Sequence, residues 1–334
     1  MIRKLAVLLS SLYVTNAYTS VEITPYVVNG SDISAVKYPS FTSLMYDRID
    51  YDRIYGASPY CGATLLTQYY VLTAAHCIYD NTDTQLFTSV VPQLQNESDF
   101  PYAITQRVMV SEYYYPDSYN SDTLANDIAI LKLSQPITVV SNYADLANSA
   151  DATVYRGSRS GEPFLAVGHG NTQSGRDVSE ALQETQLRYV SNSNCNLYNV
   201  DTSANLCMDG ASSQNGRDNA TCQGDSGGPL FWNNKQVGIT SYGPTTCGDM
   251  SLIANSIFTE VSDHRAWISS VLNGSEKPKV TVNDAQRISY LNSINANSSG
   301  GDSGGGTNSG GTNSWFGLLI LSGIALWRRK GFVS

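Results

Sequence analysis

The chain has few basic residues and no excess of positive charge. Lys and Arg number 20 among 334 residues, against 29 Asp and Glu, so the net charge is −9 at neutral pH. Nucleic-acid binding depends on neutralising phosphates with Lys and Arg. The composition therefore excludes a nucleic-acid partner, while 41% apolar residues indicate a folded globular protein with a sizeable core.

The sequence also lacks the cysteine spacing of zinc and redox sites, because none of its six cysteines belongs to a Cys-x-x-Cys pair. We therefore expect no metal. An even number of cysteines favours three disulfides in an exported chain, but six cysteines allow 15 pairings and the spacing alone does not choose among them. A calcium ion held by Asp80, Asp83 and Glu97 is the alternative that this acidic region leaves open.

Long helical segments are missing from the body of the chain. From Val27 to Val261, short β-branched and aromatic runs such as residues 70–72 alternate with polar, Gly-rich turns. Helical periodicity first appears at residues 263–272, where apolar residues recur three or four positions apart. The pattern predicts an all-β body closed by a C-terminal helix, and its length suits two packed barrels.

The two ends of the chain have the composition of targeting segments. Residues 1–17 combine a basic start, an apolar run and a small-residue cleavage site, so we expect a signal peptide and export to an oxidising compartment. Residues 273–314 are polar and then Gly/Ser-rich, which predicts a linker. Residues 315–334 contain a short hydrophobic segment with a basic end. As a helix, its apolar part rises about 20 Å, short of the roughly 30 Å of a bilayer core.

Ser226 is the candidate nucleophile. It stands in Cys-Gln-Gly-Asp-Ser-Gly-Gly-Pro-Leu, residues 222–230, where flanking glycines let backbone N–H groups approach a developing oxyanion. We expect the N–H groups of Gly224 and Ser226 to form that oxyanion hole. The same five letters recur around Ser303, but in a low-complexity tract that cannot hold a serine against a base.

His76 and Asp127 are the candidate base and its orienting carboxylate. His76 lies in Leu-Thr-Ala-Ala-His-Cys, where small residues leave room for the ring, whereas His169 and His264 have no such setting and are interpreted as structural. Asp127 opens an apolar run, where it can be buried beside an imidazole and stabilise the imidazolium without taking its proton. Both residues precede Ser226, which is not the order of an α/β-hydrolase.

Together, Thr-Ala-Ala-His-Cys, Asn-Asp-Ile-Ala-Ile-Leu and Cys-Gln-Gly-Asp-Ser-Gly-Gly-Pro-Leu resemble the motifs of chymotrypsin/trypsin-like serine peptidases over residues 27–272. The resemblance implies two six-stranded antiparallel barrels with a C-terminal helix, and hydrolysis of protein or peptide substrates through an acyl-enzyme by a monomer that needs no cofactor. It also implies three disulfide pairs: Cys61–Cys77, Cys195–Cys207 and Cys222–Cys247.

The same resemblance predicts activation and specificity. A cut after a propeptide at residues 18–26, made by another protease or by the enzyme itself, would free Val27 to pair with Asp225; Tyr26 stands where many relatives carry Arg or Lys. The base of the primary substrate pocket would be Ala220 instead of a carboxylate, which argues against cleavage after basic residues. The pocket walls would include Ser241, Gly243 and Ser256.

The C-terminal tail resembles the GlyGly-CTERM sorting signals of exported proteins in Gram-negative bacteria. That resemblance implies transient anchoring in the inner membrane and removal by a rhomboid-like membrane protease before type II secretion or surface display; a permanent anchor is the competing hypothesis for the tail. For the protein as a whole, the competing hypotheses are a catalytically dead relative that binds a partner and a surface-anchored adhesin.

Overall fold

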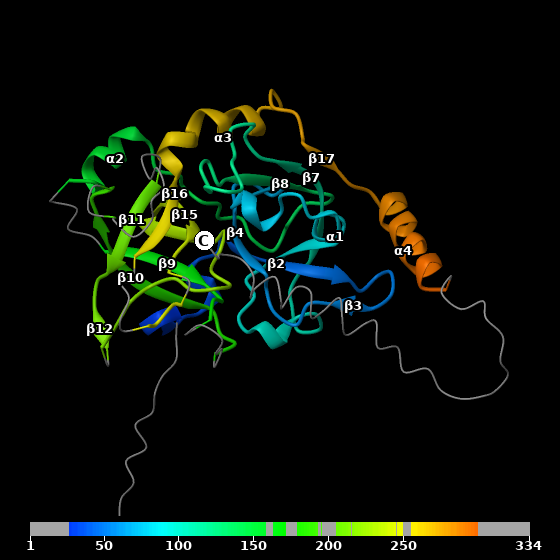
Figure 1. Ribbon diagram of the computed structural model, residues 1–334, viewed down its shortest axis with the longest axis horizontal. Helices are drawn as coiled ribbons and strands as arrows, with labels where there is room; N and C mark the ends of the chain where they lie inside the picture. Colours follow the sequence, from blue (N-terminus) through cyan, green and yellow to red (C-terminus); the bar gives the residue numbers. More distant parts are fainter. Residues whose placement is uncertain are drawn as a thin grey trace, which may run out of the picture.

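The computed structural model describes residues 27–157, 163–171, 179–192, 195, 205–214, 216–244, 246–249 and 255–299. Within these ranges the chain forms two β-barrels that lie side by side. In Figure 1 the N-terminal barrel runs from blue through cyan to blue-green, the C-terminal barrel is green to yellow, and the helix α3 (Arg265–Leu272) lies at the top of the view.

The N-terminal barrel is a closed antiparallel sheet. Its strands pair in the order β7-β6-β2-β4-β5-β8, and β7 pairs with β8 to close it. Every residue of β2, β4 and β6 is buried, including polar side chains such as Thr42 and Asp47 of β2. The six strands are β2 (Phe41–Arg48), β4 (Cys61–Leu65), β5 (Tyr70–Thr73), β6 (Thr88–Pro92), β7 (Val108–Tyr114) and β8 (Ala129–Leu133).

The C-terminal barrel has the same construction, with strand order β10-β11-β16-β15-β14-β9 and closure by β9 and β10. Two antiparallel six-stranded barrels with a C-terminal helix are therefore confirmed. The short strand β1 (Ser31–Asp32) extends this sheet at β10. The six barrel strands are β9 (Phe164–Gly168), β10 (Gln183–Val190), β11 (Asn205–Gly210), β14 (Pro229–Trp232), β15 (Lys235–Tyr242) and β16 (Ser256–Glu260).

The remaining elements are short. They are β3 (Ile54–Tyr55), which pairs with β2, the hairpin of β12 (Ser213–Gln214) and β13 (Arg217–Asp218), and the helices α1 (Thr82–Leu86) and α2 (Ser149–Tyr155). Single 3-10 turns include η1 (Val27–Asn29), η3 (Ala75–Cys77) and η6 (Val261–His264), the last leading directly into α3.

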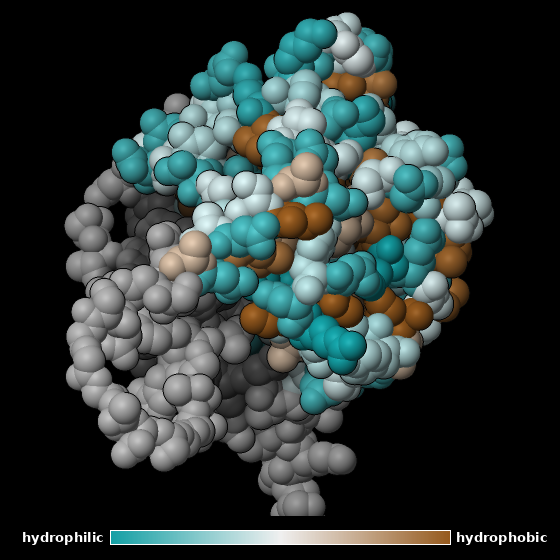
Figure 2. All heavy atoms as spheres, turned by 90° about the vertical axis from the view of Figure 1, so that its right-hand side faces the viewer, coloured by the Kyte–Doolittle hydropathy of each residue, from teal (hydrophilic) through white to brown (hydrophobic). Residues whose placement is uncertain are grey.

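Residues that follow α3 are folded against the N-terminal barrel, so the interpretation of residues 273–299 as linker was wrong. The strand β17 (Val280–Thr281) pairs with β7, and the helix α4 (Asp284–Ser299) follows it. We call residues 279–299 the C-terminal strap. Figure 1 shows α4 (orange) at the edge of the N-terminal barrel, and Figure 2 faces this side, where small hydrophobic groups are interspersed with hydrophilic residues.

The strap is attached by a buried arginine and two apolar side chains. Arg287 is 3% exposed and donates to the carbonyl oxygens of Leu86 and Val110 at 2.6 and 2.7 Å. Val282 and Leu291 are buried in the barrel's hydrophobic core. A sequence of low overall hydrophobicity is thus held by a few specific contacts.

The disulfides confirm the expected pairing: Cys61–Cys77, Cys195–Cys207 and Cys222–Cys247. Their Cα–Cα distances are 6.3, 6.1 and 5.6 Å. Among the described residues, no helix is long and apolar enough to cross a membrane. The expected signal peptide (1–17), propeptide (18–26) and hydrophobic tail (315–334) lie outside the described residues.

Candidate active site

His76 and Asp127 are brought together by two neighbouring strands of the N-terminal barrel. His76 lies on η3, just after β5, and Asp127 lies just before β8, which pairs with β5. The His76 Nδ1 is 2.7 Å from Asp127 Oδ2, and the His76 backbone N–H donates to Asp127 Oδ1 at 2.9 Å. A carboxylate on Nδ1 fixes the tautomer whose Nε2 is free to accept a proton.

The Asp127 carboxylate is fully buried and is also held by the C-terminal barrel. The Ser241 hydroxyl on β15 donates to Asp127 Oδ2 at 2.5 Å, and the Thr259 hydroxyl on β16 donates to the Asp127 carbonyl oxygen at 2.8 Å. Sequence reasoning placed Ser241 only in the pocket wall and missed Thr259. No sequence signal marks these contacts, which join residues 114 and 132 positions apart.

The Ser226 loop packs against the segment that carries His76. The Gly62 N–H donates to the Ser226 carbonyl oxygen at 2.7 Å. Gly227 has a positive φ of 75°, and a Cβ on it would lie 2.1 Å from the Thr73 hydroxyl, so only glycine allows this close approach. The nucleophile loop and the base segment are therefore fixed as neighbours.

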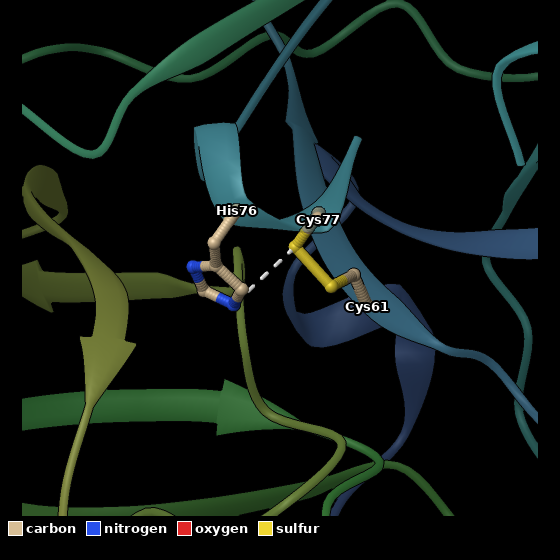
Figure 3. Close-up of side chains that lie close together, drawn as sticks. All are labelled: Cys61, His76 and Cys77. Carbon is tan, nitrogen blue, oxygen red and sulfur yellow. Dashed lines mark hydrogen bonds between the residues drawn. A yellow bond between two sulfur atoms is a disulfide. The ribbon is translucent and has the colours of Figure 1, made fainter. Parts of the chain in front are cut away.

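The His76 ring lies beside the Cys61–Cys77 disulfide, as Figure 3 shows. Its Nε2 is 3.8 Å from Cys77 Sγ, and no hydrogen bond joins it to the Ser226 hydroxyl, both residues being within the described ranges. Catalytic hydrogen bonds are often long without substrate and tighten in the Michaelis complex. The geometry thus places an oriented base next to the serine loop. The hydrogen bond between His76 Nε2 and the Ser226 hydroxyl is the one contact of the expected triad that is not formed.

The residues near the disulfide do not form a metal site. Cys61, His76 and Cys77 place their ligand atoms within 4.8 Å of one another, but the two sulfurs are bonded to each other and are not thiolates. The expected alternative calcium ligands, Asp80, Asp83 and Glu97, do not form such a group of close ligand atoms in the described part of the chain. Asp83 instead accepts a hydrogen bond from the Tyr46 hydroxyl.

The two backbone N–H groups expected to form the oxyanion hole are those of Gly224 and Ser226. Gly224 has a φ of 106°, and neither its backbone N–H nor that of Ser226 donates to another group of the described chain. Asp225, which lies between them, is 2% exposed and accepts from the N–H groups of Gly170 and Cys222, both at 2.9 Å. Oxyanion stabilisation requires N–H groups that are free to donate, and both of these are unengaged on an anchored loop.

Val27, the expected new N-terminus, is already buried in the uncut chain. Its peptide nitrogen donates to the side-chain oxygen of Gln183, and Val28 packs against Ala220 and Cys247. The segment that would begin the activated chain is therefore already docked against the C-terminal barrel.

The expected pocket residues lie on adjoining parts of the C-terminal barrel. Ala220 is fully buried, and Ser256 on β16 accepts a hydrogen bond from the Thr221 N–H at 3.0 Å. The Ser241 hydroxyl donates its hydrogen bond to Asp127, as described above. Gly243 follows β15, and a Cβ added to it would meet only the carbonyl oxygen of Asn255, at 3.7 Å. The Ser256 hydroxyl is therefore occupied, and Ala220 contributes no charge.

The pH dependence of activity follows from the His76–Asp127 pair. Burial favours neutral His76, but the charge of Asp127 and its hydrogen bond outweigh this and raise the pKa of His76 above 6.5. Only the neutral ring acts as a base, so activity is lost as the pH falls through that raised pKa. We expect the acid limb of the kcat/KM profile to lie above 6.5 and to move to lower pH in Asp127→Asn; an unmoved limb would contradict this assignment.

An Asp–His pair next to a serine loop, at the junction of two antiparallel barrels, defines a serine hydrolase of the two-barrel class. The Trypsin family model matches residues 28–268. The chain is 31% identical to human chymotrypsin-like elastase family member 1 over 74% of its length and 92% of that protein, and 30% identical to brachyurin of Leptuca pugilator over 63% and 87%. Human heparin binding protein shares the fold, with a TM-score of 0.60 at 22% identity, covering 76% of this chain and 100% of that one.

The chain belongs to the trypsin family of serine endopeptidases. The family match ends four residues before α3 does, so the C-terminal strap is an addition to the matched region.

Proposed function

We propose that the protein is an exported endopeptidase that cleaves after apolar or aromatic residues, with Ser226 as nucleophile, His76 as base and Asp127 as its orienting group. The observation that carries the specificity is Ala220, which is fully buried against Val28 and Cys247 and provides no carboxylate for a substrate cation. Placing Arg or Lys there would leave a buried charge unpaired.

The test of this specificity is a set of fluorogenic peptides that differ only in the residue on the acyl side of the cut bond. We expect kcat/KM for Phe or Leu to exceed that for Arg or Lys by at least about 100-fold, because an unpaired buried charge costs about 3–5 kcal/mol. Equal or faster cleavage after Arg would contradict the proposal. A dead, partner-binding relative is distinguished by the absence of turnover and of labelling by a fluorophosphonate.

The proposal extends to processing at both ends. We infer that the protein is made as a zymogen, because a free Val27 ammonium could reach the buried Asp225 region only after the preceding peptide bond is cut. We also infer that the tail at 315–334 directs export from a Gram-negative cell and is removed by a membrane protease. N-terminal sequencing and the intact mass of released enzyme test both inferences: a mass that retains residues 315–334 would favour a permanent anchor.

A further inference from the structure

The segment 168–171 forms the wall against which the oxyanion loop rests. The Gly170 N–H donates to Asp225 Oδ1 at 2.9 Å, and the Asn171 N–H donates to the Gln223 carbonyl oxygen at 2.7 Å. A Cβ on Gly168 or Gly170 would lie 2.2 or 2.3 Å from the Asp225 carboxyl group. The carboxylate therefore sits directly on the backbone of this segment.

The oxyanion donor itself touches the same segment. A Cβ on Gly224 would lie only 2.9 Å from the Cα of Gly170, which means that the two backbones are in close contact. A displacement of Gly170 must therefore move Gly224 and Asp225. The placement of the Gly224 N–H depends on whatever fixes residues 168–170.

His169 lies between Gly168 and Gly170, which have no side chains. Its own side chain points into the N-terminal barrel. Its ring is 6% exposed, lies 5.8 Å from the Phe41 ring, and places Nδ1 3.4 Å from the Ser43 hydroxyl; both partners are on β2 of the N-terminal barrel. Among the described groups, Nε2 has no hydrogen-bond partner of normal geometry. The ring is thus wedged between the barrels instead of being bonded at both nitrogens.

Burial also keeps this ring neutral. It lowers the pKa of His169 to about 4, against a smaller opposing effect of the neighbouring backbone at Gln95 and Leu94. A neutral, planar group suits an apolar contact with Phe41 better than an imidazolium would. His169, which the sequence analysis interpreted as structural, therefore lies next to Gly170, whose N–H donates to Asp225.

We propose that His169 is a positioning residue for the oxyanion hole. Anchored between Phe41 and Ser43 of the first barrel, its ring fixes Gly170, and Gly170 in turn fixes Asp225 and the Gly224 N–H. This inference rests on the oxyanion hole proposed above. Because an oxyanion hole acts in the transition state and not on the bound substrate, loss of the ring lowers kcat and leaves KM nearly unchanged.

The test compares His169→Ala with His169→Phe and with Phe164→Ala. Phe164 begins β9, the strand that ends one residue before His169, and it faces the core of the C-terminal barrel, so it controls for a general loss of packing. Active-site titration with a fluorophosphonate gives kcat per functional site. We expect His169→Ala to lower kcat by about 10- to 100-fold, since a misplacement of about 1 Å can cost 10²-fold. His169→Phe keeps a neutral ring and should stay within about threefold of the parent, as should Phe164→Ala.

A second readout separates positioning from mere structure. A peptidyl trifluoromethyl ketone forms an oxyanion on the enzyme, whereas the matching peptide acid does not. We expect His169→Ala to weaken binding of the ketone in parallel with kcat and to bind the acid normally. Unchanged kcat per site, or equal weakening of both ligands, would overturn the proposal; ketone binding by the parent no tighter than that of the acid would instead refute the oxyanion hole itself. If His169→Ala does not fold, His169→Leu is measured in its place and judged by the same two outcomes.

Discussion

Replacing Ser226 by alanine is expected to lower kcat/KM by about 10⁴- to 10⁶-fold without unfolding the domain. In the proposed mechanism the serine, His76 and Asp127 act as one unit, so His76→Ala should cost nearly as much, and adding one change to the other should cost little more. The measurement is hydrolysis of an apolar fluorogenic peptide by the processed enzyme, with thermal unfolding recorded for each variant.

The chain contains its own control for this experiment. Ser303 lies in the same five-residue string as Ser226, Gly-Asp-Ser-Gly-Gly, but outside the catalytic domain. Ser303→Ala should have the activity of the parent. A fully active His76→Ala enzyme, or an inactive Ser303→Ala enzyme, would end the assignment of the triad.

Ending the chain after residue 274 is expected to destabilise the N-terminal barrel by about 3–6 kcal/mol. Val282 and Leu291 would lose their burial in its core, and each buried apolar side chain contributes about 1.5–3 kcal/mol. The edge of β7 would also lose the pairing of Val280 with Tyr113 and the bond from the Val282 N–H to the Ser111 carbonyl oxygen.

A chain ending after residue 299 is the matched control for the strap, because it lacks the tail but keeps every strap contact described. Urea unfolding followed by tryptophan fluorescence should give the parent midpoint for this chain and a clearly lower one for the chain ending at 274. Equal midpoints would show that the strap contributes nothing to stability, and a low midpoint in both would assign the effect to residues beyond 299.

The sequence predicted those features that are set by residues close together in the chain. It could not predict the features that depend on contacts between residues far apart in the chain. His76 and Asp127 were found because their surroundings are encoded in adjacent residues, and strand patterning together with a family resemblance was enough for the two barrels. The strap was missed because its attachment depends on sparse residues such as Arg287, whose carbonyl acceptors at Leu86 and Val110 leave no sequence pattern.

The same reason explains the omissions at the site. Ser241 and Thr259 meet Asp127 only because the barrels dock, and periodicity within one strand gives no information about the neighbouring barrel. His169 was indistinguishable from a core histidine, since its relation to Asp225 passes through the backbone of Gly170. Contacts between segments that are far apart in the sequence are what local patterns fail to specify.

The dual attachment of Asp127 also affects the order in which the protein gains activity during folding. Each barrel could complete its own sheet while they remain apart, yet the carboxylate would then lack the hydroxyls of Ser241 and Thr259. The proposed nucleophile and base also come from different barrels, because Ser226 precedes β14 and His76 follows β5. Proteolysis therefore starts only when the two halves have docked, and a half-folded copy, which is itself the easiest substrate, is not yet able to digest its neighbours.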